Sequence, residues 1–141
     1  MPAGNRQIRL LQRVVRMREV EKRQAAVKAA QAQDMHGKLL ALQDRSSDIA
    51  ASYSARRDAG DGTALGLQLQ FTAGLEGIRG NTADEALRAK HSYRAAVSHL
   101  RLAGRRFEIT DENLSIHQRE EKMRVQSREA TSLARKLKRP S

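Results

Sequence analysis

The sequence contains no cysteine and no tryptophan, and its two prolines, Pro2 and Pro140, lie at the ends of the chain. Without cysteine, the chain can form no disulfide, no thiolate metal site and no thiol nucleophile. Small secreted domains often depend on disulfides, so this absence favours a cytoplasmic location. Because proline is confined to the ends, helices can run through almost the whole chain without losing a backbone donor.

Large aromatic side chains and long apolar runs are scarce as well. The 141 residues include two tyrosines and two phenylalanines, which predicts a thin core, because aromatic side chains bury the most area per residue. The basic N-terminal stretch has apolar runs of only two residues, such as Leu10-Leu11, which are too short for a signal peptide or a membrane span. Leu, Ala, Arg, Lys, Glu and Gln dominate instead, which is typical of long, exposed helices.

Apolar residues recur at coiled-coil spacing in the first part of the chain. The predicted stripe, with steps of four and three residues, is Met35, Leu39, Leu42, Ser46, Ile49 and Tyr53. A similar stripe opens upstream with Ile8, Leu11 and Val15, but Arg18 and Glu21 then fall where apolar residues are needed. We therefore expect a stutter between the two stretches, filled by closely packed alanines at 25–32.

Six of the nine glycines lie between residues 58 and 80, and residues 58–63 are dense in turn-forming types. The sequence thus predicts a single all-α domain over 1–141, a long antiparallel two-helix coiled coil, or helical hairpin. Helix one would span about 5–57, the turn 58–63 and helix two about 64–138. Thr82 and Glu85 fit a capping box, so a break at 80–82, or a separate short helix at 64–79, is the alternative.

The second predicted helix carries two stripes. The first consists of Tyr93, Val97, Leu100, Gly104, Phe107 and Leu114, with Asp111 as a break; the second recurs every seven residues at Ile109, Ile116, Met123, Ala130 and Leu137. A turn at 58–63 pairs residues whose numbers sum to about 122–124, such as Tyr53 with Phe71, Ile49 with Leu75 and Val15 with Ile109. Helix two would then extend beyond helix one from about residue 118, and its second stripe would face another partner.

Neither catalysis nor a bound metal or cofactor is expected. The four histidines are scattered, and His117 with Glu121 supplies two ligands where a zinc site needs a third. Gly60-Asp-Gly62 with Gly66 resembles part of a phosphate-binding loop, but a long polar helix precedes it instead of a buried strand, which favours a turn.

The net charge is +11, from 27 Lys and Arg against 16 Asp and Glu, so the partners are expected to be acidic: nucleic acid, an anionic membrane or an acidic protein surface. Basic residues crowd both ends of the chain. Those at the start are Arg6, Arg9, Arg13, Arg16, Arg18, Lys22 and Arg23; those at the end are Arg119, Lys122, Arg124, Arg128, Arg135, Lys136, Lys138 and Arg139. An antiparallel hairpin brings the two clusters together, either as an acidic-partner docking site or as a solvated charged face.

These features resemble the FliJ family of flagellar type III export proteins and, more distantly, their YscO-type counterparts in injectisomes. The resemblance extends over nearly the whole chain and rests on its length, its basic ends, the central turn and two stretches. These are Leu67-Gln-Leu-Gln-Phe71-Thr-Ala-Gly-Leu75-Glu-Gly-Ile78, and His99-Leu-Arg-Leu-Ala-Gly-Arg-Arg-Phe107-Glu continuing into Gln118-Arg-Glu-Glu-Lys122.

The resemblance implies a stalk that couples a hexameric export ATPase to the cytoplasmic region of the export gate, engages export chaperones, and lies at the cytoplasmic face of the inner membrane. The implied ATPase-docking residues are Arg9, Arg13, Arg16, Ile116, Met123, Arg128, Arg135 and Lys136. The implied gate-contacting residues are Leu42, Ile49, Tyr53, Phe71, Leu75 and Ile78. Family members often have an aromatic residue where this chain has Ile49, which weakens the gate assignment. The alternatives are a basic hairpin that binds nucleic acid and a generic scaffold coiled coil.

A two-helix coiled coil of this length predicts an elongated particle. Small-angle scattering should therefore give a radius of gyration well above the roughly 15 Å of a compact globule of this size. A value near 15 Å would contradict the predicted hairpin.

Overall fold

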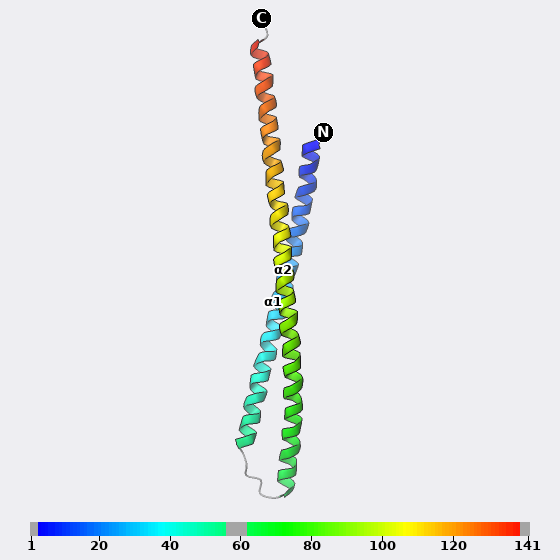
Figure 1. Cartoon of the computed structure of the whole chain (residues 1–141), viewed down its shortest axis with the longest axis vertical. Coiled ribbons are helices and arrows are strands. Elements are labelled where there is room, and N and C mark those ends of the chain that lie inside the picture. Colours follow the sequence, from blue (N-terminus) through cyan, green and yellow to red (C-terminus); the bar gives the residue numbers. More distant parts are fainter. Residues whose placement is uncertain (1–2, 56–61, 139–141) are drawn as a thin grey trace. The chain divides into compact units, whose positions relative to one another are not determined.

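The computed structural model describes residues 3–55 and 62–138, and both ranges are helical throughout (Figure 1). Helix α1 spans Ala3–Ala55, 53 residues, and helix α2 spans Gly62–Lys138, 77 residues. The two long helices pack against each other as an antiparallel hairpin, which confirms the predicted all-α coiled-coil fold. Within the described ranges, neither helix contains a segment that is long and apolar enough to cross a membrane.

The helix boundaries differ from the predicted ones near the turn. The described part of α1 ends at Ala55, so the predicted end at 57 lies outside the described residues. Helix α2 already begins at Gly62, inside the predicted turn, of which residues 58–61 are not described. Helix α2 runs without interruption through Gly80, so the predicted break is not present. Thr82 caps no helix: it is buried in mid-helix, and its hydroxyl donates to the Ile78 carbonyl at 2.8 Å. This bond to the preceding turn satisfies the hydroxyl without ending the helix.

The chain divides into two compact units, each a pair of antiparallel helix segments. The terminal unit comprises α1 up to Ala25 and α2 from Leu100 onward, and the central unit comprises Ala26 to His99.

The buried stripe of the central unit, its seam, consists mainly of small residues. On α1 the buried and half-buried positions are Ala29, Ala32, His36, Leu39, Gln43, Ser46, Ala50 and Tyr53, with Ser47 beside them. The predicted stripe shares Leu39, Ser46 and Tyr53 with this seam, but it is wrong at Met35, Leu42 and Ile49, which are 57%, 46% and 41% exposed. The seam on α2 includes Leu75, Thr82, Ala86 and Tyr93. Small residues allow the two helices to approach closely, and the larger side chains then lie beside the contact.

The seam of the terminal unit contains charged residues and no stutter. The predicted stripe Ile8, Leu11 and Val15 is half-buried, and the same spacing continues through Arg18 to Ala25. Arg18 Nη1 donates to Glu21 Oε2 at 3.0 Å, and the Lys22 ammonium lies 5.0 Å from the centroid of the Phe107 ring. Long basic side chains can cover apolar surface with their methylenes and keep their charge near water. Arg18 therefore occupies a half-buried seam position where an apolar residue was expected.

The predicted stripe on α2 is confirmed in the terminal unit. Leu100, Gly104, Phe107 and Leu114 are half-buried, whereas Asp111 is exposed and Thr110 takes the seam position beside it.

The predicted pairing between the helices is only partly correct. The Tyr53 and Phe71 rings stack with centroids 4.2 Å apart, as predicted. In the terminal unit, however, Lys22 faces Phe107, and in the central unit His36 faces Tyr93 with ring centroids 6.4 Å apart. Each partner lies about five to seven residues, between one and two turns, farther along α2 than predicted.

This offset has a physical cause. The predicted pairs Val15 with Ile109 and Ile49 with Leu75 matched large apolar residues, but Ile109 and Ile49 are exposed. The ion pairs among the described residues all join positions three or four apart on one helix. The register therefore depends on side-chain packing along the seam, where small residues match, and not on salt bridges.

The difference between a seam residue and its exposed neighbour is testable. Leu39→Asp places a carboxylate in the half-buried seam and should lower the free energy of unfolding by about 2–4 kcal/mol. Leu42→Asp, the matched control three residues away, should change it by less than about 1 kcal/mol because Leu42 is exposed. Thermal or urea unfolding followed by circular dichroism measures both values. Equal losses, or a larger loss at Leu42, would contradict the register described above.

Candidate functional site

Nearly all of the net charge of the chain belongs to one unit. By sequence, residues 1–25 and 100–141 carry 18 Lys and Arg against 8 Asp and Glu, a net charge of +10. Residues 26–99 carry 9 basic against 8 acidic residues, a net charge of +1. The terminal unit therefore carries nearly all of the positive potential of the molecule.

The basic residues predicted to dock a partner are exposed and free of ion pairs. Arg9, Arg13 and Arg16 lie on α1, and Arg128, Arg135 and Lys136 lie on α2. In the described part of the terminal unit, ion pairs involve only Arg18, Arg23 and Arg124 among the basic residues. Intramolecular carboxylates thus leave the predicted docking cations available to a partner.

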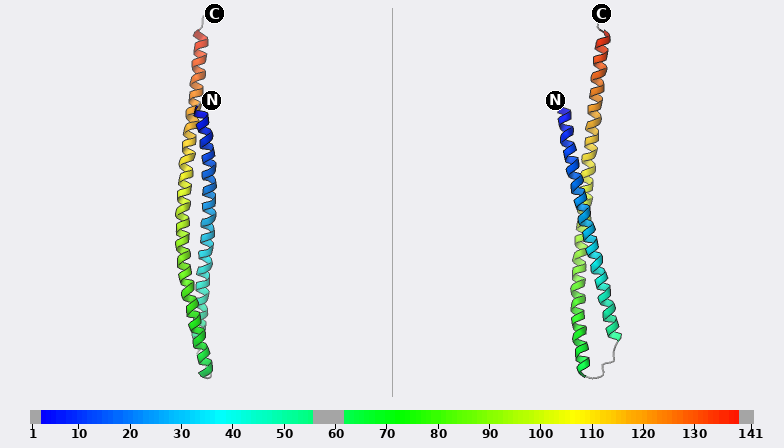
Figure 2. Two further views of the ribbon diagram at one scale, coloured as in Figure 1. Left: turned by 90° about the vertical axis from the view of Figure 1, so that its right-hand side faces the viewer. Right: turned by 180° about the vertical axis from the view of Figure 1, so that it is seen from behind.

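The two basic clusters do not lie side by side along their whole length. Gly4, at the start of α1, contacts Glu121 and Arg124 of α2. The α2 residues after Arg124 therefore extend beyond the first described turn of α1 (Figure 2), and all of them are exposed. We call residues 125–138 the overhang; at 1.5 Å per residue, it is about 21 Å long. Its start is displaced from the predicted residue 118 by the same register offset that moved the other pairs.

An apolar column runs along α2 in the terminal unit and continues through the overhang. It contains Ile109, Ile116, Met123, Ala130 and Leu137, as predicted, and the structure adds Leu102 one heptad earlier. Met123 is 69% exposed and Leu137 is 80% exposed, so no part of the described chain covers them. Val125 and Leu133, which the sequence interpretation did not select, are also exposed. The described chain thus leaves a regular row of apolar side chains exposed along α2.

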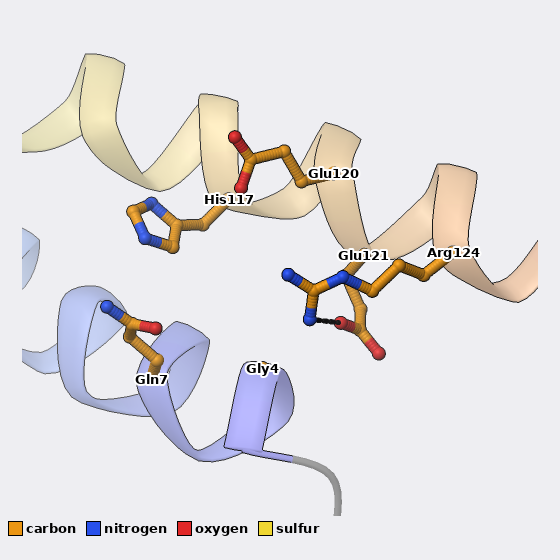
Figure 3. A pocket seen from close by; sticks show the side chains of 6 residues that line it. All are labelled: Gly4, Gln7, His117, Glu120, Glu121 and Arg124. Atoms are coloured by element: carbon orange, nitrogen blue, oxygen red, sulfur yellow. Dashed lines mark ion pairs between the residues drawn. The ribbon is translucent and has the colours of Figure 1, made fainter.

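The start of α1 meets α2 at a pocket of about 300 Å³ (Figure 3). It is lined by Gly4, Gln7, His117, Glu120, Glu121 and Arg124. Arg124 Nη1 lies 3.7 Å from Glu121 Oε2, and a Cβ at Gly4 would meet the Glu121 carboxylate. Helix α1 has no acidic residue in its first turn, so Glu121 supplies the negative charge that the positive end of the α1 dipole favours.

The pocket does not offer a metal site with the residues that the structure describes. His117 Nδ1 donates to the Asn113 carbonyl at 2.8 Å, and no group of three His, Cys, Asp or Glu side chains converges anywhere in residues 3–55 and 62–138. The two candidate ligands, His117 and Glu121, line the same pocket, as their spacing predicts.

A second apolar surface lies beside the seam of the central unit. All six residues predicted to contact a gate belong to this unit, but they are not equally accessible. Leu75 is buried and Tyr53 is half-buried beneath the stacked Phe71 ring, whereas Leu42, Ile49 and Ile78 are exposed. Of the predicted turn at 58–63, Gly62 and Thr63 are described, and both belong to the start of α2.

No protein-family model, no curated protein and no solved structure matches this chain.

The overhang should contribute little to the stability of the hairpin. All described residues lost from a chain that ends at Arg124, 125–138, are exposed. The thermal midpoint of that chain should therefore stay within about 3 °C of the full-length value while its total helical signal falls. Circular dichroism melting of the two chains measures both quantities. A large drop in the midpoint would mean that the overhang packs on the rest of the molecule.

Proposed function

We propose that this chain is a non-enzymatic stalk of a flagellar type III export apparatus, which joins the hexameric export ATPase to the cytoplasmic region of the export gate. The main support is the coincidence of a +10 charge and an exposed apolar column on the terminal unit. Export chaperones would be further partners. The protein would act in the cytoplasm, peripherally at the inner membrane at the flagellar base.

The terminal unit has both properties that docking inside an acidic protein ring requires. Its unpaired cations, such as Arg13 and Arg135, would steer the unit toward acidic subunits and raise the association rate. Its apolar column, with Met123 and Leu137 on the overhang, would lose water on insertion and slow dissociation. Charge alone would give weak binding that depends on the salt concentration. The apolar column would add contacts that do not depend on charge.

The central unit would supply the second contact. Leu42, Ile49 and Ile78 present apolar side chains on a unit of nearly neutral charge, which suits a partner that is recognised by apolar burial. Phe71, which stacks on the half-buried Tyr53 ring, is exposed as well and adds to the apolar surface of this unit. A stalk with a charged contact and an apolar contact on separate units could engage two different proteins.

The arrangement of aromatic residues argues against nucleic acid as the main partner. Single-stranded nucleic acids stack their bases on exposed aromatic side chains beside basic residues. Phe107 is the sole aromatic residue of the terminal unit, and it is half-buried in the seam with the Lys22 ammonium over its ring. The basic surface can therefore hold phosphates, but it offers no ring for a base.

Two variants test the proposal against the export ATPase. Replacing Ile116, Met123 and Leu137 with serine removes apolar contacts and keeps the charge, so ATPase binding should weaken at least tenfold through faster dissociation. Replacing Arg13, Arg16, Arg135 and Lys136 with glutamate should weaken binding through slower association. Surface plasmon resonance at two salt concentrations separates these two effects.

A matched control removes the same amount of apolar surface elsewhere. Serine at Leu65, Leu67 and Leu69, which are exposed in the central unit, should leave ATPase binding unchanged. If the column variant binds the ATPase as well as the wild type, and the wild type binds DNA with a steep loss on added salt, the proposed stalk function is wrong.

A further inference from the structure

The exposed apolar side chains of the central unit gather on one side of its helix pair. Leu42 and Ile49 occupy the heptad position one residue before a seam position on α1, and Phe71 and Ile78 occupy the same position on α2. In an antiparallel pair of helices, equivalent heptad positions that flank the seam lie on the same side of it. We call these four residues, with the 64% exposed Leu67 one turn from Phe71, the central face.

The central unit buries little apolar surface between its own two helices, so covering the central face would add to its apolar interior. Its buried apolar residues are Ala29, Leu75 and Ala86, and no large side chain in the described chain is fully buried. Stable helical domains bury their apolar stripes between at least two layers. Two helical hairpins commonly achieve this by packing face to face into a four-helix bundle.

We propose that the central face is covered by the central face of a second copy of this chain, giving a two-fold symmetric four-helix bundle. The charge of the unit permits this occupant. Residues 26–99 carry a net charge of +1, so two central units can meet with little repulsion, whereas the terminal units at +10 each repel one another and weaken the association.

Two charged residues at the edges of the central face suggest how the copies are oriented. Arg45 lies on α1, one turn from Leu42 and Ile49, and Glu85 lies on α2, one heptad after Ile78. Neither forms an ion pair among the described residues. A two-fold axis parallel to the helices places α1 of one copy over α2 of the other, which brings Arg45 level with Glu85 of the second copy and Ile49 level with its Ile78.

The available area fits a reversible dimer. Large aromatic side chains offer roughly 150–250 Å² each and aliphatic ones somewhat less, so five that are about half exposed present on the order of 500 Å² per copy. With its polar rim, the interface reaches about the 1,000 Å² in total that specific association requires. We therefore expect micromolar self-association that strengthens when salt screens the terminal units.

The proposal does not depend on the export function, but it concerns the surface assigned above to the gate. A second copy and a gate would compete for Ile49 and Ile78, so the dimer would be the form in which the gate-binding surface is covered.

The mass in solution and paired variants test the interface. Multi-angle light scattering at about 100 µM should give twice the chain mass of 15.8 kDa for the wild type. Ile49→Glu combined with Ile78→Glu should raise the dissociation constant at least tenfold, with unchanged helical circular dichroism. Leu102→Glu combined with Ile109→Glu, a matched change at exposed positions of the terminal unit, should leave the dimer intact. A wild-type mass of one chain, or equal effects of the two double variants, would overturn the proposal.

Cross-linking tests the orientation, because the chain has no native cysteine. When Ile49→Cys and Ile78→Cys chains are mixed and oxidised, the disulfide between the two different variants should form at least five times more than either disulfide between identical chains. Predominant cross-links between identical chains would overturn the proposed axis.

The cytoplasmic region of an export gate separates the two proposals. A monomeric wild type that binds this region through Ile49 and Ile78 would overturn self-association and leave the stalk function standing. A chain that is dimeric and does not bind this region would support self-association and contradict the stalk function.

Discussion

The narrow contact between two helices is the constraint on which the rest of the structure depends. A pair of helices buries one stripe from each, and here the stripe is built from alanine, serine and threonine at positions such as Ala25, Ala103, Ser46 and Thr82. Small residues bring the backbones close and gain dispersion contacts, but each removes little apolar area from water. Many of the larger apolar side chains, such as Leu42, Ile49 and Met123, therefore remain outside the contact, and the surfaces proposed to bind partners follow from this narrow interior.

The charged layer near Arg18 shows how such a seam tolerates residues that a wider core would exclude. Arg18 pairs with Glu21 on its own helix, and Lys22 reaches over the Phe107 ring of the opposite helix. In a broad core these charges would need burial and compensation, but beside a seam one side chain wide their ends stay near water. The heptad spacing therefore continues through residues that looked like a stutter when they were judged by polarity alone.

The sequence predicted the helical hairpin correctly because composition and the placement of proline and glycine decide that level of structure. It did not predict the register, since that depends on which of two stripes is buried. Met35, Leu42 and Ile49 look more like a seam than His36, Gln43 and Ala50 because they are large and apolar, yet close approach favours the smaller set. The Tyr53–Phe71 contact was predicted correctly, whereas Val15 and Ile109 were paired wrongly because Ile109 is exposed. The seven-residue spacing identified the apolar column but not Leu102, Val125 and Leu133, which are also exposed.

Several glycines inside α2 lower the helix propensity of the segment that carries Phe71 and Ile78. Gly66, Gly74, Gly77 and Gly80 lie inside the helix, and a Cβ added at any of them would meet no atom within 4 Å, so packing does not require glycine there. Each costs about 1 kcal/mol of helix stability relative to alanine. The segment that carries Phe71 and Ile78 is therefore intrinsically weak as a helix, while its exposed side chains can gain from contact with another protein. A partner that binds only the helical form stabilises it by mass action. The segment thus combines a low helix propensity with an exposed apolar surface, so binding of the proposed partners would increase its stability.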